Sequence, residues 1–138
     1  MQWFYRLFLI ITATRVFDLF VRSYDYLDNG DLDPVEIAGA GAELWSVSGF
    51  LIALSVLLGL WKNTKLTAWS CVAAGAYFTS LGLVALLHAI PSFPDGVRVA
   101  TAYASIGVVW FVVSFFWNGY AAVQDDREHR GESCGANK

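Results

Sequence analysis

The chain alternates between long apolar stretches and short polar gaps, and this pattern predicts its secondary structure. Four apolar stretches make up most of the chain, at about residues 3–21, 37–61, 66–90 and 99–123. An α-helix rises about 1.5 Å per residue, so each stretch is long enough to cross a hydrocarbon core of about 30 Å. Because the gaps are short, consecutive helices should run antiparallel. The sequence therefore predicts an all-α membrane protein, a four-transmembrane-helix bundle in up-down-up-down order.

Composition agrees with this prediction and adds no second domain. Of the 138 residues, 57% are hydrophobic and 15% are charged, whereas a typical soluble domain has about 25% charged residues. We expect one transmembrane domain over residues 1–123 and a polar cytoplasmic tail over residues 124–138, which continues the last helix briefly and then becomes disordered. Arg15 and Asp18 interrupt the first stretch and no small-residue cleavage site follows it, so we expect a retained helix rather than a signal peptide.

The distribution of basic residues predicts the orientation. Cytoplasmic loops are enriched in Lys and Arg, and Trp favours the membrane interface. One set of helix ends holds most of the basic residues, whereas the opposite set has only Arg22 and Arg98. Both termini should therefore be cytoplasmic, in a plasma or inner membrane. The residues that gather at the inner ends are Arg6, Lys62, Lys65, Arg127, Arg130 and Lys138, together with Trp3, Trp61, Trp69 and Trp117.

Small residues recur at helical spacing in three of the stretches and predict where helices approach closely. Lipid supplies no hydrophobic force between helices, so membrane helices associate through close backbone packing. We expect these small residues to pack helices of the same chain against one another. The alternative is that they form a surface that binds a second copy of the chain. The residues are Ala38, Ala42 and Ser46 in the second stretch, Gly75, Thr79 and Gly82 in the third, and Ala100, Ala104 and Gly107 in the fourth.

The gap between the first two helices is an acidic loop on the outer side. Asp25 falls at position one of a twelve-residue pattern, Asn29 at five, Asp33 at nine and Glu36 at twelve, with a glycine at position six. In this register the loop resembles an EF-hand calcium loop, and it departs from the pattern where Leu27 replaces an oxygen ligand. The resemblance covers this loop alone. It implies low-affinity Ca²⁺ binding by Asp25, Asn29, Asp31, Asp33 and Glu36.

The same loop residues have a structural explanation. Asp33 can cap the second helix, Pro34 can take its first position, and Glu36 can complete a capping box. Asn29 and Gly30 form an ordinary turn dipeptide. Both explanations stay open at this point.

Ionisable residues inside the apolar stretches fall in the outer half of the predicted bundle. A charge in hydrocarbon is costly, so each one indicates a partner or a function. Arg15, Asp18, Glu43 and His88 would line an outward-opening cavity for an ion, a headgroup or a small polar ligand, with Tyr77 or Tyr103 deeper. The alternative is mutual neutralisation, with Arg15 paired to Asp18 or Glu43.

The sequence contains no catalytic motif. It has no CxxC, HExxH, phosphate-binding loop or nucleophile elbow, and His88 is the sole histidine in a predicted span, so bis-histidine haem is excluded. The absence of a basic block excludes nucleic acid as a partner. We expect a binding, sensing or accessory subunit in contact with the lipid bilayer and with a protein partner or a second copy. The alternatives are an oligomeric small-solute or ion transporter that uses Asp18 and Glu43, and a membrane enzyme with an outward-facing acid/base site at Glu43 and His88.

Overall fold

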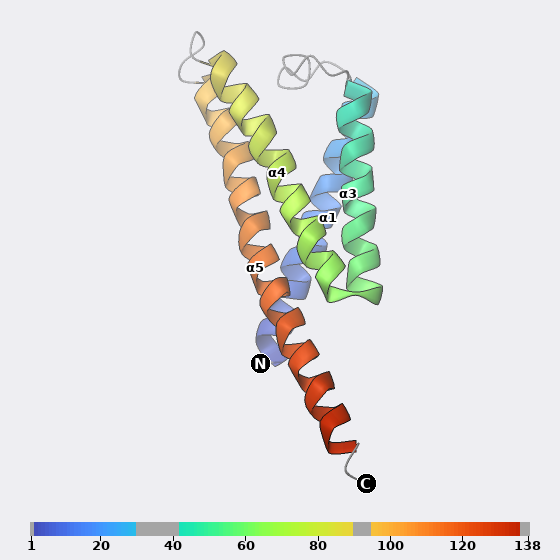
Figure 1. Cartoon of the computed structure of the whole chain (residues 1–138). Helices are drawn as coiled ribbons and strands as arrows, with labels where there is room; N and C mark the ends of the chain where they lie inside the picture. The colour runs from blue at the N-terminus through green and yellow to red at the C-terminus, as the bar shows by residue number, and fades with distance from the viewer. Residues whose placement is uncertain (1, 30–41, 90–94, 136–138) are drawn as a thin grey trace.

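The protein is all-α throughout the part of the chain that the structure describes. The computed structural model describes residues 2–29, 42–89 and 95–135, and each of them except Asn63 is helical. The helices are α1 (Gln2–Asn29), α3 (Ala42–Lys62), α4 (Thr64–Ala89) and α5 (Asp95–Gly135). They pack lengthwise into one bundle (Figure 1). We call the end that holds the last turns of α1 and the first turn of α3 the upper end, and the end that holds the first turns of α1 and the α3–α4 turn the lower end, as in Figure 1. The all-α prediction is confirmed.

α4 and α5 approach each other closely because small residues face one another along their contact. A Cβ atom added to Gly82 would lie 3.1 Å from the carbonyl oxygen of Ala100 and 3.1 Å from the amide nitrogen of Ala104. A Cβ atom added to Gly107 would lie 3.1 Å from the carbonyl oxygen of Gly75. The contact positions ascend along one helix as they descend along the other, so the two helices are antiparallel. Small-residue packing between the third and fourth apolar stretches is thus confirmed.

α3 and α4 are joined by a turn at Asn63. The Asn63 amide donates to the carbonyl oxygen of Gly59 at 2.8 Å, and the Asn63 side-chain oxygen accepts from the Lys65 amide at 2.9 Å. Asn63 therefore ends one helix and caps the next, which is a common role for asparagine. Gly59 has no room for a side chain, since a Cβ atom there would lie 2.5 Å from the Thr67 amide nitrogen. The chain reverses direction within this one residue.

The lower half of α1 packs against the lower half of α5 through aromatic side chains. Phe8 stacks on Phe116 with ring centroids 3.9 Å apart. Trp117 Nε1 donates to Thr12 Oγ1 at 3.0 Å, and both side chains are fully buried. Trp117, expected near the inner interface, is buried between the helices, where Thr12 supplies the acceptor that a buried indole needs. Three other tryptophans expected at the interface are exposed at the lower end, namely Trp3, Trp61 and Trp69.

Large apolar side chains are exposed along the whole bundle. They include Leu51, Leu54 and Leu58 on α3, Leu83 and Leu87 on α4, and Val108, Val112 and Phe115 on α5. Three helices, α3, α4 and α5, are long and apolar enough to cross a membrane. α1 differs from the other three because every stretch of 18 residues within it carries at least three charged side chains.

α5 continues well beyond the other helices at the lower end. Its last part projects below the α3–α4 turn (Figure 1) and stays helical to Gly135, where the sequence suggested disorder. Asp126 accepts from Arg130 at 3.3 Å one turn further on, and Asp125 pairs with Lys65 of α4 at 2.6 Å. Ion pairs spaced by four residues support a helix, and the pair with Lys65 ties the projecting part to the bundle.

Candidate functional site

Asp18, one residue of the charged cluster predicted for the upper end, forms an ion pair with Arg22 of the same helix. Arg22 Nε donates to both carboxylate oxygens of Asp18 at 3.2 Å, and the guanidinium carbon lies 5.6 Å from the centroid of the Tyr103 ring. Arg22 therefore connects α1 to α5 by a cation–π contact. The neutralisation alternative paired Arg15 with Asp18 or Glu43, whereas the structure pairs Asp18 with Arg22. Side chains in a helix lean toward its N-terminus, so an arginine one turn after the aspartate reaches back to it.

The remaining residues of the predicted cavity lie on different helices. Arg15 is partly buried on α1, and Glu43 is exposed in the first turn of α3. Neither makes an ion pair within the described ranges. A carboxylate in the first turn of a helix is stabilised by the helix dipole, which gives Glu43 a structural reason for its position. His88 belongs to the last turn of α4, and its side chain lies outside the described part.

The predicted calcium loop lies mostly beyond the described residues. Asp25 and Asn29 occupy the last turns of α1, where Asp25 is exposed. Asp31, Asp33 and Glu36 fall in the gap between residues 29 and 42. Within the described ranges, no group of three or more His, Cys, Asp or Glu side chains is placed to hold a metal ion. Calcium binding by this loop stays a prediction.

Buried polar atoms connect three helices just below the upper end. Tyr77 Oη of α4 donates to the Trp45 carbonyl oxygen of α3 at 2.8 Å, and Ser46 Oγ of α3 donates to the Ser23 carbonyl oxygen of α1 at 2.6 Å. Ser23 Oγ and Trp45 Nε1 are buried without a hydrogen-bond partner among the described residues. Gly49 lies opposite Ser23, where a Cβ atom would collide with the Ser23 hydroxyl. The two hydrogen bonds link α4 to α3 and α3 to α1.

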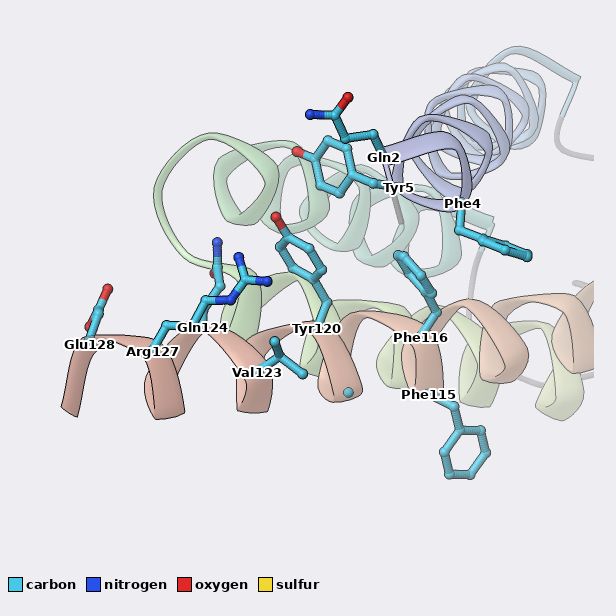
Figure 2. Close-up of a pocket in the computed structure, with 11 residues that line it drawn as sticks. Gln2, Phe4, Tyr5, Phe115, Phe116, Tyr120, Val123, Gln124, Arg127 and Glu128 are labelled. Atoms are coloured by element: carbon cyan, nitrogen blue, oxygen red, sulfur yellow. The ribbon is translucent and has the colours of Figure 1, made fainter. Parts of the chain in front are cut away.

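An open cleft of about 920 Å³ lies at the lower end, between the first turns of α1 and the lower part of α5. Figure 2 shows Tyr5 of α1 above Tyr120 of α5, with Phe116 on the same side of α5. Gln124 and Arg127 follow further along α5, so the lining changes from aromatic to polar along the helix. We call this space the lower cleft.

A second, more polar hollow of about 440 Å³ adjoins the lower cleft on the side of the α3–α4 turn. The two share Tyr5, Tyr120, Gln124 and Glu128. Its far wall is the turn around Asn63, where Thr64 Oγ1 donates to Gln124 Oε1 at 3.1 Å. The lower end is therefore hollowed on both sides of Tyr120.

Sequence reasoning missed the lower cleft because its walls are more than a hundred residues apart in the chain. A usable signal is present in α5 alone. Phe116, Tyr120, Gln124, Arg127 and Glu128 recur at spacings of three and four, so they share one helix face. That face passes from aromatic to charged along the axis, which is typical of a helix that leaves an apolar environment.

The described residues offer little for covalent chemistry. Cys71 is fully buried among apolar side chains of the core, so it is a packing residue and is closed to substrates. The comparisons with known proteins supply no further lead: no protein-family model matches the chain, and neither a curated protein nor a solved structure is significantly similar to it.

Proposed function

We propose that this chain is an integral membrane protein whose four helices cross the bilayer in up-down-up-down order. The exposed apolar surface carries this proposal. Leucine, valine and phenylalanine side chains face outward on α3, α4 and α5, and soluble monomers rarely expose continuous apolar surface on this scale. In hydrocarbon the same surface is in its preferred environment.

α1 is the least apolar of the four helices. In the proposed orientation, its charged side chains lie near the membrane interface or can reach it. The Asp18–Arg22 pair lies near the upper end. Arg15 lies seven residues lower, about 10 Å along the axis, and long arginine side chains extend toward the interface. Packing of α1 on α3 and α5 further reduces its contact with lipid.

The charge distribution favours a cytoplasmic lower end. The lower end has more lysines and arginines than the upper end, and they flank the exposed tryptophans. This distribution is expected for the inner face of a plasma or inner membrane. With this orientation both termini are cytoplasmic, and the projecting part of α5 stands in the cytoplasm.

We assign the protein to the binding or accessory class rather than to enzymes or transporters. The lower cleft, open beside the projecting part of α5, supports this assignment. For an ion pathway through Asp18, the carboxylate would first have to release Arg22, which contacts both of its oxygens. The acidic outer loop remains a second candidate binding surface, for Ca²⁺ or a protein partner.

Alkaline extraction and cysteine labelling test the proposal. The full chain should stay with the membrane in alkaline carbonate. Gln2→Cys and Tyr24→Cys, each in a Cys134→Ser background, place single reporters at exposed positions of the lower and upper ends. A membrane-impermeant maleimide should label Tyr24→Cys in intact cells and Gln2→Cys only after permeabilisation. Release by carbonate, or labelling of both reporters from the same side, would overturn the proposal.

A further inference from the structure

The lower cleft combines features of an amphiphile site. One face of α5 runs along it from Phe116 through Tyr120 to Arg127 and Glu128. These thirteen residues span about 18 Å at 1.5 Å per residue, close to the thickness of one bilayer leaflet. Phe4 of α1 and Phe115 of α5 border the aromatic end and are exposed, so the cleft is open toward the surface that we assign to lipid.

The boundary between apolar and polar residues on α5 crosses the cleft. α5 has no charged side chain between Val99 and Val123 and is polar from Gln124 onward, and both Val123 and Gln124 line the cleft. In the proposed orientation this boundary is the level at which hydrocarbon gives way to headgroups. An occupant with an acyl chain and a polar head would therefore have both parts in matching surroundings.

Among the described residues that line the cleft, Arg127 is the one cation and Glu128 the one anion. Lys65 and Arg130 are paired with Asp125 and Asp126, whereas Arg127 and Glu128 make no ion pair within the described ranges. A guanidinium binds phosphate through two parallel hydrogen bonds, and a carboxylate can receive an ammonium group. One charge of each sign fits a zwitterionic headgroup better than an anionic one.

From this geometry we propose that the lower cleft binds one phospholipid with an amine-bearing, zwitterionic headgroup. Its phosphate contacts Arg127, its ammonium contacts Glu128, and an acyl chain lies along Phe116 toward Phe4. This inference rests on the proposed membrane location and names the ligand of the same cleft.

Gly119 provides a direct way to fill the cleft. It lines the cleft, and a Cβ atom there would meet no atom within 4 Å. Gly119→Leu should therefore fold normally and occupy the space of the acyl chain. Gly131→Leu is the matched control, because Gly131 is equally open but lies on the projecting part of α5 away from the cleft.

The test is native mass spectrometry of the full chain in a phosphate-free detergent, titrated with phosphatidylethanolamine, phosphatidylglycerol or diacylglycerol. Wild type should bind one phosphatidylethanolamine more tightly than the other two lipids. Gly119→Leu and Arg127→Gln should each weaken this binding by about tenfold or more, since charge-assisted hydrogen bonds and a filled site act on the bound state directly. Gly131→Leu and Arg130→Gln should bind as wild type. Glu128→Gln should abolish the preference over phosphatidylglycerol.

Three outcomes would overturn the inference. They are equal affinity for the three lipids, unchanged binding in both Gly119→Leu and Arg127→Gln, and a dimer that Gly119→Leu converts to monomer, which would identify a second copy as the occupant. Carbonate extraction keeps the two proposals apart. A protein that stays in the membrane but shows any of these results loses only the lipid site, whereas a protein released by carbonate loses both.

Discussion

Trp117 of α5 donates its indole hydrogen to the hydroxyl of Thr12 on α1 across the buried core of the lower half. The Thr12 hydroxyl in turn donates to the Phe8 carbonyl oxygen at 2.6 Å, so its lone pairs are free to accept from the indole. Together with the ring contacts of Tyr5 and Phe8 on α5, this bond holds the lower halves of the two helices against each other.

We expect Thr12→Val to destabilise the fold by about 1 kcal/mol or more, because it leaves a buried indole donor without an acceptor. Thr14→Val is the control. Thr14 is exposed and bonds only to the Ile10 carbonyl of its own helix, so the same chemical change should have little effect. Unfolding in sodium dodecyl sulfate measures both, and equal losses would contradict a special role for Thr12.

Gly59→Ala should be strongly destabilising, by about 1–3 kcal/mol, because its methyl group would meet the backbone of Thr67 at the Asn63 turn. Gly119→Ala makes the same change at an open helical position and should stabilise by up to about 1 kcal/mol through helix propensity. Opposite shifts of the unfolding midpoint are the expected result. Tolerance of alanine at Gly59 would mean that the turn is looser than its hydrogen bonds indicate.

Alanine should destabilise the protein at Ser46 but not at Ser23. Ser46→Ala removes the bond from Ser46 Oγ to the Ser23 carbonyl oxygen, and we expect a loss of about 0.6 kcal/mol, the average for such bonds in a membrane protein. Ser23→Ala removes a buried hydroxyl that has no partner in the described part of the chain, so it should be neutral or stabilising. A larger loss for Ser23→Ala than for Ser46→Ala would show that the Ser23 hydroxyl has a ligand in the native protein.

Cys71 should report global unfolding. Its side chain is fully buried, so in a Cys134→Ser background a maleimide should react at least about a hundredfold more slowly with the native protein than with the unfolded one. The same assay then serves as the folding check for every variant above. Rapid labelling of the native protein would reveal a local opening of α4.

Asp18→Asn should reduce stability by less than about 1 kcal/mol, because the Asp18–Arg22 pair is about one third exposed and Arg22 keeps its contact with Tyr103. Liposomes that contain this variant or Glu43→Gln should show the same ion permeability as wild-type liposomes. Wild-type ion flux that Asp18→Asn abolishes would instead favour the transporter alternative.

The sequence predicted the features that follow from helical periodicity and from the cost of polar groups in lipid. Gly75, Gly82 and Gly107 could be recognised in advance because close packing leaves no choice of side chain. The charged face of α1 was also recognised, although its pairing required the side-chain direction that separates Arg22 from Arg15.

The lower end was harder to predict because it depends on contacts between distant parts of the chain. Trp117 resembles an interface anchor until Thr12 is placed beside it, and Tyr5 becomes a cleft residue only opposite Tyr120. No local pattern reports such a juxtaposition. Candidate functional residues therefore lie at both ends of the bundle, and not only in the half where the sequence places the ionisable residues.

The length of α5 has a mechanical consequence. An uninterrupted helix of 41 residues is a stiff rod of about 60 Å, and close packing on α4 prevents it from bending away along the bundle. Tyr103, which holds Arg22, and Arg127, at the edge of the lower cleft, are carried on this same rod. In the proposed membrane orientation, a protein that pulls on the projecting end of α5 would therefore act on residues at both ends of the bundle.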